Sequence, residues 1–363
     1  MFGASVGSFL NVVIYRLPEG RSIVRPGSSC PRCGWKLPWH ENLPIVGWLR
    51  LRGRCSSCKS SISSQYILIE FLVGLTFAGL YLLFFVTPLR SSLGSVSGEW
   101  WHYAGIAGAW PAFAIILTVF SGLLAATIID ARTFLIPGPI TTSMILIGLG
   151  AWCLQGVMPT RPILEELWPI PLGSTSLVGL SLGAAAGVAG GMLGLRTGFI
   201  PRSFMDYEEY VEEGETLGDY PHGRREMFKE MLFLLPIVIG GIVGWFVVRQ
   251  FFGPDLQLPM WLLAISSSIF GGLVGGGAIW LVRILGTLGF GREAMGMGDV
   301  HLLVAIGVCL GISSIKFALD ENYSLAVIFI VFASILDALD GRIARLIKGT
   351  TEFGKELDSL TDF

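Results

Sequence analysis

The sequence predicts an all-α polytopic membrane protein of about eight or nine transmembrane helices. Of its 363 residues, 52% are hydrophobic and 14% are charged, whereas soluble domains have roughly 25% charged residues. The charged residues gather in a few segments, and the apolar runs between them are long enough to cross a bilayer. The net charge of −2 provides no wide basic surface, so we expect no nucleic-acid partner.

Eight apolar runs have the roughly 20 residues that a transmembrane helix requires. They lie at 66–87, 110–129, 139–158, 174–195, 231–252, 261–288, 300–319 and 322–339. A shorter run at 1–15 precedes them, without the basic leader and cleavage site of a signal peptide. We expect this run to be a truncated first transmembrane helix.

The basic residues of the loops orient these helices, because flanks rich in Lys and Arg stay in the cytoplasm. The segment 16–64 carries nine such residues and 196–229 carries five, whereas 88–109 and 159–173 carry one each. We therefore place the first two segments in the cytoplasm. The insert 196–229 also holds many acidic residues, which is typical of a solvated, partly helical segment without a catalytic role.

Four of the six cysteines form two CxxC pairs, which are separated by 21 residues. The pairs are Cys30–Cys33 and Cys55–Cys58. Their spacing predicts either a four-thiolate zinc site or two disulfides, and a reducing cytoplasm favours zinc. Four thiolates leave no open position for water, so we predict a structural ion that folds a small cytoplasmic zinc-ribbon-like loop. We expect Cys153 and Cys309 to be buried packing residues.

Two aspartates at the ends of apolar runs form a second candidate site, since an ionisable group at a membrane span is costly and often functional. Asp130 ends the run 110–129, and Asp299 begins the run 300–319 after a Gly-x-Gly sequence. The predicted topology places both at the cytoplasmic surface. Two carboxylates at one depth could share a proton and activate a water, as in an aspartic protease. The alternative is two helix-end carboxylates that only contact water.

These motifs resemble the type IV prepilin leader peptidases over about 1–310. The opening Gly7–Pro18 and the cysteine segment resemble the family's first helix and zinc loop, and Asp130 and Asp299 fall on its two catalytic aspartates, the second in a Gly-x-Gly-Asp motif. The resemblance implies a membrane-embedded aspartic endopeptidase that removes the leader peptides of type IV prepilins and of type II secretion pseudopilins. It also implies N-methylation of the new N-terminus with S-adenosylmethionine.

The resemblance further implies a bacterial inner-membrane location, with the zinc loop and catalytic aspartates on the cytoplasmic side. The implied partners are prepilin or pseudopilin substrates and membrane lipids. No glycine-rich nucleotide-binding fingerprint is visible, so residues that bind the methyl donor stay unassigned. Glu70 also matches a family position, although it could equally be a helix-packing acid that pairs with an arginine. The sequence departs from the family at Gly138-Pro139, where an acid is usual, and at His301, where Lys is common.

A different motif follows beyond about Gly307. Its four acids are Asp337, Asp340, Asp358 and Asp362. Spacings of i,i+3 and i,i+4 on two helices would turn these carboxylates toward each other and suit a divalent ion on a pyrophosphate. The motif resembles CDP-alcohol phosphatidyltransferases, phosphatidylserine synthases in particular. That resemblance implies three metal-binding aspartates and Asp362 as the base, with Mg²⁺ or Mn²⁺ required if the tail is functional.

The expected organisation has four parts. They are a truncated transmembrane helix at 1–15, a cytoplasmic zinc-binding loop at 16–64, intramembrane aspartic peptidase helices at 65–310 with the cytoplasmic insert 196–229, and a partial CDP-alcohol phosphatidyltransferase-like segment at 311–363. The predicted function is prepilin peptidase. The alternatives are a phosphatidyltransferase activity of the tail and an inactive chimeric remnant, and the sequence predicts no particular oligomeric state.

Overall fold

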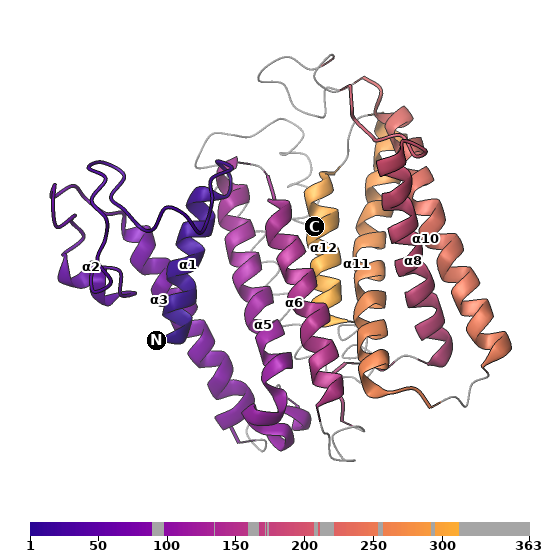
Figure 1. The fold of residues 1–363 in the computed structure, drawn as a ribbon, viewed down its shortest axis with the longest axis horizontal. Coiled ribbons are helices and arrows are strands. Elements are labelled where there is room, and N and C mark those ends of the chain that lie inside the picture. The colour runs from indigo at the N-terminus through magenta and orange to yellow at the C-terminus, as the bar shows by residue number, and fades with distance from the viewer. Residues whose placement is uncertain are drawn as a thin grey trace. The chain divides into compact units, whose positions relative to one another are not determined.

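A computed structural model gives the fold of the chain (Figure 1). It describes residues 1–363 except 89–97, 134, 159–166, 171, 173, 207–209, 211–220, 253–256, 292–294 and 312–363. The described part is helical apart from loops and two isolated β-bridges. The predicted all-α class is therefore confirmed.

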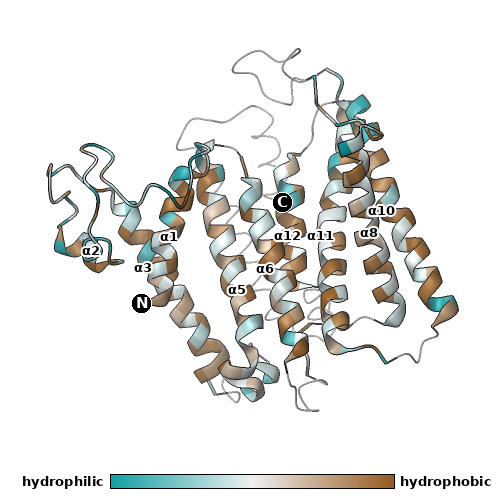
Figure 2. Cartoon of the chain, viewed as in Figure 1, coloured by the Kyte–Doolittle hydropathy of each residue, from teal (hydrophilic) through white to brown (hydrophobic). Residues whose placement is uncertain are grey.

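Six helices of the described part are long and apolar enough to cross a membrane. They are α3 (Ser64–Tyr81) with its continuation η1 (Leu82–Val86), α5 (Glu99–Thr133), α6 (Gly138–Val157), α8 (Thr175–Thr197), α10 (Gly223–Phe251) and α11 (Met260–Phe290). The shorter helices are α1 (Phe2–Arg16), α2 (Val46–Arg50) and α12 (Met297–Leu310). Figure 2 shows hydrophobic residues along the long helices and hydrophilic ones in the loop after α1. The chain is thus a multi-pass membrane protein.

These helices match six of the eight predicted spans, with different ends. The run 300–319 is described only as far as α12 and Gly311, and the run 322–339 lies outside the described residues. The expected count of eight or nine is therefore not confirmed. The helix α5 begins at Glu99, well before the predicted start at 110, because an apolar window passes over the Trp-Trp-His-Tyr sequence after Glu99.

A glutamine from α6 satisfies the backbone of α5 where that helix is irregular. Gly105 has φ 61° inside α5, and Pro111 further along lacks an N–H. The amide of Gln155 donates to the Gly108 carbonyl (2.7 Å) and accepts from the Ala112 N–H (3.3 Å). Because Gln155 is 1% exposed, these bonds meet the requirement that buried polar groups be paired.

The described helices divide into two compact units. Of the described residues, the first unit contains Met1–Ile106 and Leu117–Ile140, and the second contains Ala107–Ile116 and the residues from Thr141 to Gly311. The helix α5 therefore contributes residues to both units.

In the first unit, small residues of α1 bring its backbone close to α3. A Cβ added at Gly7 would lie 2.7 Å from the Cα of Glu70, and one added at Gly3 would lie 2.8 Å from the Cβ of Phe77. The Asn11 amide donates to the Tyr66 carbonyl at 3.0 Å. Close backbone approach and interhelical hydrogen bonds are the means by which helices associate in a bilayer.

In the second unit, α8 and α10 lie side by side (Figure 1) along a stripe of glycines. The glycines of α8 recur at every fourth residue, at Gly179, Gly183, Gly187 and Gly191. A Cβ at Gly183 would collide with the carbonyl of Gly240 on α10. The helix α12 packs on α11 in the same way, because a Cβ at Gly307 would collide with the carbonyl of Gly271.

We expect Gly183→Ala to destabilise the second unit, because its new methyl group meets the α10 backbone rather than a side chain that could move. Overpacking of this kind costs about 1–3 kcal/mol, and thermal unfolding in detergent measures it. Gly190→Ala is the matched control on the same helix, since nothing lies within 4 Å of a Cβ there. Equal unfolding temperatures for the two variants would contradict the packing described.

Candidate metal centre and acidic site

The four cysteines of the two CxxC pairs converge in the loop between α1 and α3. Their sulfur atoms all lie within 4.8 Å of one another. The Sγ atoms of Cys30 and Cys58 are 3.8 Å apart, and those of Cys33 and Cys55 are 3.9 Å apart. A tetrahedron with Zn–S bonds of about 2.3 Å has edges of roughly 3.8 Å, whereas a disulfide needs about 2.05 Å. The cluster could therefore hold a structural metal ion, and its dimensions fit zinc.

The two pairs have the same backbone fold. The Cys30 N–H donates to the Trp35 carbonyl and the Cys55 N–H donates to the Ser60 carbonyl, both at 2.9 Å. An isolated β-bridge closes each turn. The residue after the second cysteine takes a positive φ in both, 71° at Gly34 and 56° at Lys59. Each CxxC sequence thus forms one tight turn that directs its two sulfur atoms toward those of the other pair.

Backbone donors surround the sulfurs. The N–H groups of Cys33 and Arg32 lower the pKa of the Cys30 thiol to about 6. The Trp35 N–H lowers the pKa of Cys33 in the same way, but lost hydration and the three neighbouring sulfurs outweigh it and raise that pKa to about 11. The four thiols therefore do not all ionise together, because a thiolate at one cysteine raises the pKa of a neighbouring thiol. A bound cation would remove this conflict by favouring four thiolates at once.

The matched turns allow a paired test of the metal site. An L-residue in the left-handed region costs roughly 1–2 kcal/mol, so we expect Gly34→Val to weaken zinc binding roughly tenfold. Lys59→Gly should instead leave the zinc affinity unchanged or raise it, because glycine adopts the left-handed conformation without the steric cost that Lys59 has there. The substitution loses only the exposed hydrogen bond from Lys59 Nζ to the Ser56 carbonyl. Competition with a chelator of known affinity measures both. Equal affinities of the two variants would show that the turns do not shape the site.

A buried carboxylate attaches this loop to α3. Glu70 is 7% exposed, and its Oε2 accepts the Ile45 N–H at 2.6 Å. Ile45 precedes α2 and has a φ of 63°. The Glu70 carboxylate thus accepts hydrogen bonds from a strained backbone amide of the loop and from the Ser8 hydroxyl. Within the part of the chain that the structure describes, it has no ion pair with the arginine that the packing alternative required. Glu70 positions the segment that follows the first CxxC pair.

The two candidate catalytic aspartates each lie at a helix end, one in each unit. Asp130 is three residues before the end of α5 and is partly buried. Asp299 lies in the first turn of α12, also partly buried, and its carboxylate accepts the N–H of Gly296. Gly296 is the N-cap of α12, and an acid three residues later that reaches back to the N-cap N–H is half of a capping box. This hydrogen bond thus restrains the Asp299 carboxylate against the start of α12.

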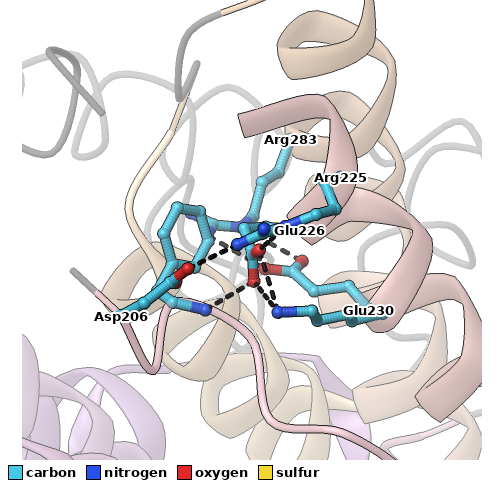
Figure 3. Close-up of polar contacts among 7 residues, drawn as sticks. Asp206, Arg225, Glu226, Glu230 and Arg283 are labelled. Atoms are coloured by element: carbon cyan, nitrogen blue, oxygen red, sulfur yellow. Dashed lines mark hydrogen bonds and ion pairs between the residues drawn. The ribbon is translucent and has the colours of Figure 1, made fainter. Parts of the chain in front are cut away.

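Two buried acids of α10 form ion pairs (Figure 3). Glu226 is 0% exposed and contacts Arg225 (3.0 Å) and Lys229 (2.9 Å), and it accepts the Phe204 N–H at 2.7 Å. Arg225 also pairs with Asp206 at 2.5 Å. The described start of the insert 196–229 is therefore packed against α10, and the last residues of that insert are helical from Gly223. Most described residues of the insert are nevertheless exposed, and its last residues are helical, which agrees with the expected solvated, partly helical segment. Burial is confined to a few positions such as Glu226 and Met227.

The second acid is Glu230, which is 3% exposed and pairs with Arg283 of α11, 1% exposed, at 3.0 Å. Neither residue was singled out from the sequence. The signal was present, because Arg283 is the lone charged residue inside the run 261–288, and intramembrane charges are functional candidates by default.

Other predicted site residues are located as follows. Cys309 is a packing residue as expected, 1% exposed and close to Trp152 and Met144. Cys153 is only partly buried, so the expectation of a buried packing residue is not met there. The acids of the tail motif, Asp337, Asp340, Asp358 and Asp362, lie outside the described residues.

Comparison with known proteins finds two family models on the chain. Residues 1–84 match the bacterial peptidase A24 N-terminal domain. Residues 301–363 match CDP-alcohol phosphatidyltransferase. The second match begins two residues after Asp299, inside α12. No solved structure matches the chain.

Several curated proteins named prepilin leader peptidase/N-methyltransferase are similar to this chain. That of Myxococcus xanthus is 57% identical over 77 residues, which cover 21% of this chain and 23% of the relative. That of Pseudomonas aeruginosa is 36% identical over 173 residues (41% and 51%), and that of Neisseria gonorrhoeae is 34% identical over 174 residues (41% and 52%). The chain thus spans about half or less of these relatives. Both resemblances drawn from the motifs, to prepilin leader peptidases and to CDP-alcohol phosphatidyltransferases, are confirmed.

Proposed function

We propose that this chain is a membrane-embedded aspartic endopeptidase that removes leader peptides from type IV prepilins and pseudopilins. The observation that carries the proposal is the match of residues 1–84 to a peptidase domain, in the very segment where four thiols converge. Relatives named prepilin leader peptidase/N-methyltransferase support the same activity.

Asp130 and Asp299 are the proposed catalytic pair. The order of the helices supports this, because four candidate spans, α6, α8, α10 and α11, lie between the end of α5 and the start of α12, and successive spans cross a bilayer in alternate directions. The end of α5 and the start of α12 then lie on the same side of the membrane. The positive-inside rule favours the cytoplasm for that side, since the basic loop between α1 and α3 is on it too. The bacterial relatives support an inner-membrane location.

The chemistry follows from two carboxylates of which one is ionised and one carries a proton. The ionised aspartate takes a proton from water, and the water oxygen attacks the scissile carbonyl carbon. The protonated aspartate then gives its proton to the leaving amine as the carbon–nitrogen bond breaks. A prepilin has a charged leader before an apolar helix, so its scissile bond rests at the membrane surface where we place both aspartates.

Zinc is the proposed ion of the cysteine cluster. Cys30, Cys33, Cys55 and Cys58 would hold it as thiolates and leave no site for a reactive water. Its role would be to fold the loop that Glu70 attaches to α3.

Methyl transfer from S-adenosylmethionine is proposed only because the curated relatives carry N-methyltransferase in their names. A groove of about 480 Å³ beside α10 does not fit this charged donor, because its lining is apolar. The lining residues are Phe199, Ile200, Leu232, Leu235, Pro236, Ile239, Gly240 and Val243. We assign no residue to the methyl donor and derive no step through it.

Incubation of the purified chain in detergent with a synthetic prepilin tests the proposal. We expect two products whose masses sum to the substrate plus one water, with cleavage at the junction of leader and apolar helix. Cleavage should persist in EDTA while the protein keeps its zinc, because the aspartates need no divalent ion. Zinc-loaded, folded protein that leaves the prepilin intact would refute the peptidase.

A second function is proposed for the tail, on the match of residues 301–363 to CDP-alcohol phosphatidyltransferase. We propose that Asp337, Asp340 and Asp358 would bind Mg²⁺ or Mn²⁺ and that Asp362 would be the base. The chain would then be a chimera whose parts join near Gly307. Transfer from CDP-diacylglycerol that requires Mg²⁺ or Mn²⁺ and is lost in Asp340→Ala would support this. Genomic DNA that places the two parts in separate genes would refute the fusion.

A further inference from the structure

Burying the ion pair of Glu230 and Arg283 costs desolvation free energy. Packing alone does not explain why the chain has an ion pair at this place. A buried ion pair can often be replaced by apolar side chains without loss of stability. Here the Glu230 carboxylate accepts two hydrogen bonds from Arg283, from Nε (3.2 Å) and from Nη2 (3.0 Å). It accepts a further hydrogen bond from the indole N–H of Trp280 (2.7 Å). The carboxylate therefore fixes one side of the guanidinium.

The other side of the guanidinium points at the start of α12. Nη1 of Arg283 donates to the carbonyl of Met295, and the ring of Phe204 covers the guanidinium with its centroid 5.6 Å from Cζ. Figure 3 shows Arg283 extended from α11 toward Glu230. A planar guanidinium whose two edges are both bonded cannot rotate, so it holds the two groups in a fixed relation.

The Met295 carbonyl and the Gly296 N–H belong to one peptide group, which is rigid and planar. Arg283 binds the carbonyl end of this group, and the Asp299 carboxylate accepts its N–H end. A Cβ on Gly296 would lie 3.5 Å from Oδ2 of Asp299, which shows how closely the carboxylate covers this residue. Arg283 also attracts the Asp299 carboxylate through space. A continuous set of contacts thus runs from Glu230 through Arg283 and one peptide plane to Asp299.

We propose that Glu230 and Arg283 are positioning residues of the peptidase, which hold the Met295–Gly296 peptide so that the Asp299 carboxylate keeps one orientation. The proposal rests on the proposed function, which makes Asp299 catalytic. Because neither residue touches the substrate in this scheme, their loss should impair the chemical step and leave substrate binding intact.

The test compares Arg283→Met, Arg283→Lys and Glu230→Gln in the prepilin cleavage assay. We expect Arg283→Met to lower kcat about 10²-fold, the size of effect that a misplaced catalytic group has, with KM changed by less than about twofold. Arg283→Lys keeps the cation and one donor, so it should recover part of kcat, and Glu230→Gln should lie between wild type and Arg283→Met. Arg249→Met is the matched control, because Arg249 is exposed near the other end of α10.

Hydrogen exchange of the amides of residues 296–300 gives a readout that needs no cleavage. Loss of the Met295 anchor should speed exchange there at least about tenfold relative to the wild type. Thermal unfolding identifies variants that fail to fold. If Arg283→Met does not fold, the kcat and the exchange rate of Glu230→Gln, which keeps the shape and volume of the side chain, test the proposal instead. Unchanged kcat in Arg283→Met, or unchanged exchange in the folded variants, would overturn the positioning role. If the wild type itself does not cleave, the proposed function fails, and the exchange comparison still decides whether Arg283 holds this segment.

Discussion

Asp130→Asn and Asp299→Asn are each expected to abolish prepilin cleavage while the protein stays folded. An amide neither takes a proton from water nor gives one to a leaving amine. Removing one of the two acid–base groups should lower kcat by at least about 10²–10⁴-fold. The initial rate of product formation, measured by mass spectrometry, checks this.

Glu99→Gln is the matched control for these variants, because it makes the same change to an exposed acid at the opposite end of α5. We expect wild-type kcat and unfolding temperature for it. A folded Asp130→Asn or Asp299→Asn protein with more than about a tenth of the wild-type rate would contradict the assignment of that residue.

Cys33→Ser is expected to remove the bound metal and unfold the loop between α1 and α3. Of residues 17–63, Cys30, Gly47, Gly53 and Cys55 are the ones that are buried. With so small an apolar core, the loop must obtain its stability from the metal, and a structural zinc contributes about 10–16 kcal/mol of apparent binding free energy in small zinc domains. Metal analysis should fall from one zinc per chain to almost none.

Limited proteolysis should then cut Cys33→Ser within 17–63 at conditions that leave the wild type intact. Cys153→Ser is the control, since Cys153 lies in α6 and is not one of the four clustered cysteines, and this variant should keep its zinc and its resistance. A Cys33→Ser protein that retains a full equivalent of zinc would show that the four thiols do not form the metal site.

The long helices and the metal site were accessible from the sequence because each depends on a local pattern. Length and apolarity predict α6, α8 and α11, and the two CxxC pairs predict a cluster since each makes its own turn. The start of α5 was not predictable in the same way, because the aromatic residues that follow Glu99 have polar edges and lower the apolar signal.

Contacts that join distant segments were less accessible. The bond of Glu70 to the Ile45 N–H depends on the path of the whole loop, which no residue pattern specifies. Glu230 and Arg283 are 53 residues apart, and their partnership follows from how α10 and α11 pack. A rule that treats every charge within an apolar run as a candidate would have selected Arg283, but not its partner.

The proposal that Asp130 and Asp299 form one catalytic pair is tested most directly by cross-linking. The double variant Asp130→Cys/Asp299→Cys, with Cys153 and Cys309 replaced by alanine and zinc bound to the other four cysteines, would be treated with a short bis-methanethiosulfonate reagent. Digestion and mass spectrometry should find the peptides of residues 130 and 299 linked. Glu99→Cys/Asp299→Cys should give no link, because Glu99 begins α5 on the opposite side of the predicted membrane. A folded, zinc-loaded protein without the 130–299 link, or with an equal 99–299 link, would contradict a shared active site.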